Sequence, residues 1–278
     1  MAHSALKDIR TALAAGRLIP YLGPGMLELM PECPVPNTPE ELATLMTTRV
    51  QVPHKIRNRL TAAAQFIENF KHRKTLISLM RQAFSAGAQP STLHRYLAAH
   101  PALPLIVDTW YDDAMQNALA TRADWGQVQG LSQAEHFGRW TGWYNADAKP
   151  TSECAAQDWQ TLLYKPLGSV APAGNFIVSD SDYVEVLTEI DIQTPIPQRV
   201  QDLREGRSFL FLGCRFNDQL QRSFARQIMK RSSGSHWAVL PGEPTRNEQR
   251  FLEEQHIECI DMQLEQFEAL LLRLELSS

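Results

Sequence analysis

The stretch Leu18-Ile19-Pro20-Tyr21-Leu22-Gly23-Pro24-Gly25-Met26 decides how the whole chain is interpreted. A short apolar run ends in two glycines that flank a proline, a pattern typical of a strand buried on both faces of a parallel sheet. Ligands of open α/β sheets bind at the carboxyl ends of the strands, where a glycine-rich turn can present N–H groups to a phosphate. Such glycines more often form a plain tight turn, so the interpretation depends on similar junctions elsewhere.

Apolar runs that end in turn residues recur along the chain, with segments of helical periodicity between them. The clearest is Ser208-Phe209-Leu210-Phe211-Leu212-Gly213, and other strands are expected over 103–107, 162–164, 236–240 and 257–260. Helices are expected over 4–15, 194–205 and 244–255, after Asp180 or Ser181 as the cap, after Asp218 and at the carboxyl end. This alternation predicts an α/β fold, a Rossmann-like doubly wound parallel sheet with right-handed crossovers.

Two segments interrupt the alternation. Residues 38–99 keep helical spacing and open with Thr38-Pro39-Glu40-Glu41, which has the form of a capped helix start. They predict a helical insertion after the first strand. Residues 122–160 are rich in Trp and Tyr without a clear period, and we expect an aromatic-rich irregular insertion, packed over the sheet edge or part of a contact surface. No linker is evident, so we expect one domain over 1–278.

Composition excludes several classes of protein. The 278 residues are 44% hydrophobic and 21% charged, with a formal net charge of -4. This profile is typical of a soluble globular protein, offers no basic field for nucleic acid, and contains no apolar run of the roughly 20 residues that a membrane-spanning helix needs. The cysteines form no C-x-x-C pair, so a four-thiolate zinc site has no local support, and a reduced cytoplasmic protein without a metal is expected.

Five junctions carry a family resemblance. They are Gly23-Pro24-Gly25-Met26-Leu27, Asp108-Thr109-Trp110-Tyr111-Asp112, Lys165-Pro166-Leu167-Gly168-Ser169, Ser179-Asp180-Ser181-Asp182-Tyr183 and Phe211-Leu212-Gly213-Cys214-Arg215-Phe216-Asn217-Asp218. Their order and spacing resemble the sirtuin-like family, the broad bacterial set related to the sirtuin deacylases. The resemblance covers nearly the whole chain and implies an NAD-binding crevice above the strand ends. The cofactor-binding positions that it implies are Gly23, Gly25, Asp108, Thr109, Asp112, Gly213, Arg215 and Asp218.

The residues that perform the family's chemistry are replaced. The resemblance implies an Asn in the second motif and a His in the third, and these positions hold Trp110 and Leu167. Neither side chain has an acceptor with which to orient a water or take a proton. Pro24 also lacks the N–H that a phosphate-binding turn would use. We therefore predict a sirtuin-like pseudoenzyme, a protein-interaction or nucleotide-sensing module without efficient NAD cleavage, for which NAD and ADP-ribose are candidate ligands.

Several residues have two interpretations. Trp110 either fills the space that nicotinamide would occupy, or stacks on some other planar ligand, or, as we favour, packs as an aromatic in a vacated pocket. The carboxylates after the second strand, among them Asp108 and Asp112, either bind a ribose or metal or cap a helix, and Asp218 is first expected to cap a helix. Arg215 either grips a phosphate or carboxylate or forms a surface ion pair.

A different class of function stays open as the alternative. The chain would then be an NAD hydrolase of the antiphage-defence type that uses relocated residues such as Asp108, Tyr111 or Asp112. If the chain is instead a pseudoenzyme, the aromatic-rich stretch 125–159 is the candidate surface for a partner protein or for self-association.

Overall fold

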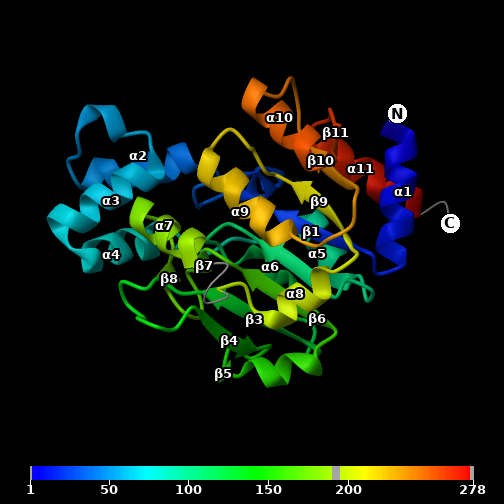
Figure 1. Cartoon of the computed structure of the whole chain (residues 1–278), viewed down its shortest axis with the longest axis horizontal. Helices are drawn as coiled ribbons and strands as arrows, with labels where there is room; N and C mark the ends of the chain where they lie inside the picture. Colours follow the sequence, from blue (N-terminus) through cyan, green and yellow to red (C-terminus); the bar gives the residue numbers. More distant parts are fainter. Residues whose placement is uncertain (1, 190–194, 276–278) are drawn as a thin grey trace.

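The computed structural model describes residues 2–189 and 195–275, and a mostly parallel sheet forms its centre (Figure 1). The strand order is β11-β10-β9-β1-β2-β6-β3-β4-β5, parallel from β11 to β3 and antiparallel for β4 and β5. This confirms the predicted Rossmann-like, doubly wound fold. The strands are β1 Leu18–Leu22, β2 Leu105–Asp108, β3 Trp125–Gly130, β4 Thr141–Asn145, β5 Pro150–Thr151, β6 Thr161–Lys165, β9 Ser208–Leu212, β10 His236–Val239 and β11 Ile257–Ile260.

Both faces of the sheet are buried, as the continuous apolar run of β1 requires. Ile19 and Tyr21 belong to one cluster of buried side chains, and Leu18 and Leu22 to another. The second cluster contains residues of α1 Ala2–Ala14, α5 Thr92–Ala99, α6 Ala114–Leu119 and α11 Leu264–Glu275. The first contains residues of α7 Asp180–Glu189, α8 Gln198–Arg204, α9 Gln219–Met229 and α10 Arg246–Glu254. Helices therefore cover the two faces separately.

A helical insertion follows β1, as predicted. It comprises α2 Pro39–Arg49, η2 His54–Ile56, α3 Leu60–Lys71 and α4 Arg73–Ala83, after which α5 returns the chain to the sheet. The expected start is confirmed, because the Thr38 side chain accepts a hydrogen bond from the Glu41 N–H at 3.1 Å. In Figure 1, α2, α3 and α4 form a lobe at one end of the sheet. The remaining short elements are η1 Pro24–Leu29, η3 Glu153–Gln157 and the hairpin β7 Gly168–Ser169 with β8 Asn175–Phe176.

Arg73 joins this lobe to the rest of the molecule. Its guanidinium lies 2.8 Å from Asp182 at the start of α7, 3.3 Å from Glu68 of α3 and 3.5 Å from Glu135. It also donates to the carbonyl of Phe176. These contacts bridge sequence separations of up to 109 residues, so they fix the insertion relative to the sheet.

The expectation of an irregular insertion over 122–160 is wrong. This segment supplies β3, β4 and β5 to the main sheet, and β3 pairs in parallel with β6. The strand was missed because Gln127 and Gln129 break the apolar pattern, although both are buried. The amide of Gln129 donates to Gln127 Oε1 at 2.7 Å and to the Ala171 carbonyl at 2.8 Å. Hydrogen bonds thus permit polar side chains inside a buried strand.

The aromatic residues of this segment differ in exposure. Trp125 and Trp143 are buried, whereas Phe137 is 97% exposed. Trp140, Tyr144 and Trp159 are partly exposed, and Trp159 packs against Trp143 with ring centroids 6.4 Å apart. The contact surface expected over 125–159 therefore stays a prediction.

Helix limits differ slightly from those expected. The first helix begins at Ala2 and not at residue 4, and α8 spans 198–204, while residue 194 of its expected range lies outside the described residues. Ser179, one residue before the expected cap, accepts the Asp182 N–H at 3.3 Å at the start of α7. Among the described helices, none has the length and apolar character required to cross a bilayer.

Candidate functional site

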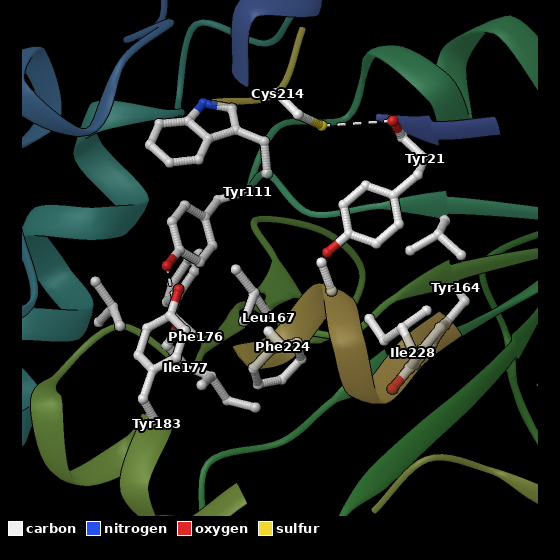
Figure 2. Close-up of a cluster of buried hydrophobic side chains, with 14 of the residues drawn as sticks. Tyr21, Tyr111, Tyr164, Leu167, Phe176, Ile177, Tyr183, Cys214, Phe224 and Ile228 are labelled. Carbon is white, nitrogen blue, oxygen red and sulfur yellow. Dashed lines mark hydrogen bonds between the residues drawn. The ribbon is translucent and has the colours of Figure 1, made fainter. Parts of the chain in front are cut away.

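A cavity of about 230 Å³ lies at the carboxyl ends of the central strands. Residues directly after β1, β2, β6 and β9 form its inner part, and residues of α2, the loop before α3, and α3 form the facing wall. Figure 2 shows Tyr21, Leu167, Tyr183 and Phe224 converging from four different parts of the fold. The cavity is lined by Tyr21, Gly23, Pro24, Pro39, Glu40, Asn58, Arg59, Leu60, Thr61, Thr109, Trp110, Leu167, Tyr183, Cys214, Arg215, Phe216, Asn217, Asp218, Gln221 and Phe224.

The structure brings together part of the expected site. Trp110 and Leu167, where the resemblance implies an Asn and a His, line the cavity, and so do the expected positions Gly23, Thr109, Arg215 and Asp218. The expected positions Gly25, Asp108, Asp112 and Gly213 do not line it. Among the lining residues that sequence reasoning missed, Tyr183 lies in the fourth quoted motif, while Glu40 and Arg59 come from the insertion and carried no signal.

The glycine turn after β1 is bonded to the loop after β9. The N–H of Gly23 donates to the Leu212 carbonyl and that of Gly25 to the Gly213 carbonyl, both at 2.9 Å. The N–H of Met26 donates to the Gly23 carbonyl at 3.1 Å. Gly213 has φ +64, and a Cβ there would lie 2.2 Å from the Met26 nitrogen. These glycines therefore permit two loops to touch, and their N–H groups point to protein carbonyls.

Trp110 packs as an internal aromatic residue. Its side chain is 3% exposed, and the indole Nε1 donates to the Pro36 carbonyl at 2.8 Å. Its ring lies 5.9 Å from that of Phe84 and 5.0 Å from that of Tyr111. These contacts support the packing interpretation and make the indole one wall of the cavity.

The acidic residues at the end of β2 and just after it make contacts that stabilise the fold. Asp108 and Lys165 form a buried ion pair at 2.6 Å, and Asp108 Oδ1 accepts the Trp110 N–H at 3.1 Å. Asp112 is buried and accepts the Ala114 N–H at the start of α6 at 2.8 Å. Burial, followed by repulsion from Asp108, raises the pKa of Asp112. The Asp112 carboxylate therefore satisfies an N–H at the start of α6, of which Asp113 is the N-cap residue, and this agrees with the capping role weighed for it.

Arg215 is committed to an ion pair. Its Nε and Nη2 donate to the two carboxylate oxygens of Glu248, each at 3.0 Å. Glu248 is fully buried and also accepts the N–H groups of Phe216 and Thr245 and the Thr245 hydroxyl. The planar fork of the guanidinium is thus occupied by a carboxylate of the same chain.

Asp218 is a helix cap, as expected. Its Oδ1 accepts the N–H groups of Leu220 at 2.7 Å and Gln221 at 3.2 Å at the start of α9. The Asp218 carboxylate therefore accepts these N–H groups at the helix N-terminus, which would otherwise be available to an anionic ligand.

The buried floor of the cavity holds three titratable side chains, Tyr21, Tyr183 and Cys214. Burial is the first cause that raises the pKa of each one. All three therefore stay protonated near neutral pH. The charged lining residues Glu40, Arg59, Arg215 and Asp218 are exposed at the rim. Within the described chain, no group of three or more His, Cys, Asp or Glu is placed to hold a metal.

Comparison with known protein families matches residues 104–260 to the SIR2-like domain. The match spans more than half of the chain and runs from the residue before β2 to the end of β11. It includes the lining residues that follow β2, β6 and β9. No curated protein sequence gives a significant match.

Proposed function

Because the chain belongs to the SIR2-like family, we propose that it is a non-catalytic member whose cavity serves a binding or sensing role without efficient cleavage of NAD. The observation that carries this proposal is the chemistry of the cavity floor. General acid–base catalysis near neutral pH requires a side chain whose pKa lies near the working pH. The floor instead offers Tyr21, Tyr183 and Cys214, whose pKa values are all raised by burial.

Proteins of this family generally bind NAD, so the fit of that cofactor can be tested against these residues. A pyrophosphate needs hydrogen-bond donors at the strand ends. The N–H groups of Gly23, Gly25 and Met26 donate to carbonyls, and the Arg215 fork holds Glu248. These residues do not fit the pyrophosphate, and we derive no reaction step through NAD.

The alternative of a hydrolase with relocated residues receives little support. Asp108 is paired with Lys165, and Asp112 accepts an N–H at the start of α6. The hydroxyl of Tyr111 donates to the Ile177 carbonyl at 2.9 Å. None of these three residues lines the cavity, so none is placed to meet a ligand there.

The proposal is tested by incubating the purified full chain with NAD and measuring nicotinamide by chromatography. We expect no release above the buffer blank. The matched control is Gln221→Trp, which places a large ring at a partly exposed lining position of α9 and is purified in the same way. Release that increases with protein concentration and disappears in Gln221→Trp would overturn the proposal. Equal release from both proteins would not depend on the cavity. It would indicate a contaminating enzyme and would not count against the proposal.

A further inference from the structure

We propose that the cavity binds an aromatic ring compound that is uncharged or singly cationic and carries no phosphate. This inference deepens the proposed function and rests on it. It follows from three properties of the lining: its anion-binding donors are used internally, its free charges are on balance negative, and its floor is aromatic.

The donors that would favour a phosphate are already satisfied by this chain. Glu248 accepts five hydrogen bonds, from two nitrogens of the Arg215 guanidinium, the Phe216 N–H, the Thr245 N–H and the Thr245 hydroxyl. Asp218 occupies the N–H groups at the start of α9. A phosphate would have to displace carboxylates that are covalently part of the protein. That exchange gains no new hydrogen bonds and separates an established ion pair.

The rim charges also disfavour an anion. Because Arg215 is neutralised by Glu248, the remaining charged lining residues are Glu40, Asp218 and Arg59. Two carboxylates thus oppose one guanidinium, so the formal charges of these three residues are on balance negative. A cleft lined by one sign of charge concentrates ligands of the opposite sign. A dianionic pyrophosphate is therefore repelled, whereas a neutral or cationic ligand is tolerated or attracted.

The floor suits a flat ring. Tyr21, Trp110, Tyr183, Phe216 and Phe224 all line it, and Figure 2 shows Tyr21, Tyr183 and Phe224 around the same space. These five aromatic side chains offer apolar contact to a flat ring, and aromatic faces also attract a cationic ring.

Polar groups remain for the outer edge of such a ligand. Asn58, Asn217 and Gln221 line the cavity, and no side-chain hydrogen bond is present for them among the described residues. An amide offers both a donor and an acceptor, so these residues can recognise hydroxyl or amide groups on a ring substituent. The ligand class is therefore a ring with uncharged polar substituents, of the kind that nucleosides represent.

The test compares ligands that differ only in phosphate. Binding of adenosine and AMP, and of nicotinamide riboside and nicotinamide mononucleotide, is measured by isothermal titration calorimetry on the full chain. We expect the phosphate-free member of at least one pair to bind about tenfold more tightly, equivalent to about 1.4 kcal/mol. Equal or tighter binding of the phosphorylated member in both pairs would overturn the inference, and so would absence of binding by all four compounds.

Variants then place the ligand in this cavity. Gln221→Trp is expected to abolish binding, with a melting temperature and heteronuclear NMR spectrum that show an intact fold. Glu40→Gln removes a rim carboxylate and is expected to weaken the cationic nicotinamide riboside about threefold relative to adenosine. Glu205→Gln is the matched control, because Glu205 is exposed before β9, at the opposite end of that strand. Unchanged binding in Gln221→Trp would overturn the assignment to this cavity.

The outcomes separate this inference from the proposed function. Tighter binding of the phosphorylated compounds without release of nicotinamide from NAD would reject the ligand class and leave a non-catalytic protein. Release of nicotinamide that depends on the cavity would reject the proposed function itself.

Discussion

The Trp110 side chain forms part of the cavity wall and also connects the sheet to the segment that leads into the helical insertion. Its indole N–H reaches the Pro36 carbonyl, which lies in the segment that leads into α2. The ring meanwhile packs on Phe84 and Tyr111. Trp110 stands where the resemblance implies an Asn, and the smaller side chain of an Asn would not fill this structural role.

Truncation of Trp110 should be costly. Trp110→Ala removes a buried ring and leaves a cavity, so we expect a loss of about 3–5 kcal/mol in the free energy of unfolding. Trp110→Phe keeps most of the ring and loses the bond to the Pro36 carbonyl, so we expect about 1–2 kcal/mol. Urea unfolding followed by circular dichroism measures both. Equal losses for the two variants would show that packing of the ring is not the main contribution.

His94 makes stability depend on pH. Its Nδ1 lies 2.8 Å from the Ser91 hydroxyl and 3.3 Å from the Ser91 nitrogen, whose N–H it accepts. The imidazole is therefore neutral in the folded protein. Burial lowers its pKa from 6.5 to about 4. As the pH falls below 6.5, the unfolded chain gains a proton at His94 before the folded chain does.

The free energy of unfolding should therefore decrease as pH falls from 6.5 toward 4. A single histidine contributes up to about 1.4 kcal/mol per pH unit in this window. Asp112, whose pKa is raised, acts in the opposite direction, so the comparison is made between proteins. We expect urea unfolding at pH 6.5, 5.5 and 4.5 to give a shallower slope for His94→Asn than for the wild type. Parallel slopes would contradict the assignment.

At the scale of elements, the contact between the turn after β1 and the loop after β9 gives the cavity its inner edge. Parallel pairing of β1 with β9 brings their carboxyl ends together, with Leu22 opposite Leu212. Gly213 then lies against Gly25 and Met26. This contact shapes the cavity, and it also forms the hydrogen bonds of the N–H groups of Gly23 and Gly25 to the loop after β9.

Gly213→Ala should test this contact, with Gly206→Ala as its control. Both glycines have φ near +65, but a Cβ at Gly206 meets nothing within 4 Å, whereas one at Gly213 lies 2.2 Å from the Met26 nitrogen. We expect a loss of about 1 kcal/mol for Gly206→Ala, from the left-handed backbone alone. Gly213→Ala should lose at least about 2 kcal/mol more, because the loops must separate. Similar losses, measured by urea unfolding, would mean that the loops can move apart freely.

For the whole molecule, the helical lobe is joined to the sheet by a shared buried core and by the ion pairs of Arg73. Arg73 binds Asp182, Glu135 and the Phe176 carbonyl, all outside the lobe. Asp182 is 2% exposed, so loss of its charged partner leaves a buried carboxylate less well compensated. Residues of α2 and α3 form one wall of the cavity, so the lobe that Arg73 joins to the sheet also contributes to the site.

Arg73→Met should therefore loosen the lobe. We expect a loss of about 3 kcal/mol and faster amide hydrogen exchange in α3 and α4, with β1 and β9 unchanged. The control is Arg226→Met, which breaks an exposed pair with Glu254 and should cost less than about 1 kcal/mol. Uniformly faster exchange over the sheet and lobe would show that the two unfold together and that Arg73 does not act as a local clamp.

The sequence by itself determined most parallel strands of the sheet and the helical insertion. The runs Leu18–Leu22 and 209–212 are apolar because strands buried on both faces accept few polar side chains. Likewise, Thr38 marks the first insertion helix because capping is a local interaction. The family resemblance identified Trp110 and Leu167, and both line the cavity.

Only the tertiary structure decided what these residues contact. The bonds of Gly25 to Gly213, Asp108 to Lys165 and Arg215 to Glu248 join residues far apart in the chain, so no local pattern reveals them. The buried strand β3 was hidden for the same reason, because the partners of its glutamines include the distant Ala171 carbonyl. Side-chain type is a local property, whereas the choice of hydrogen-bond partner depends on which segments the fold brings into contact.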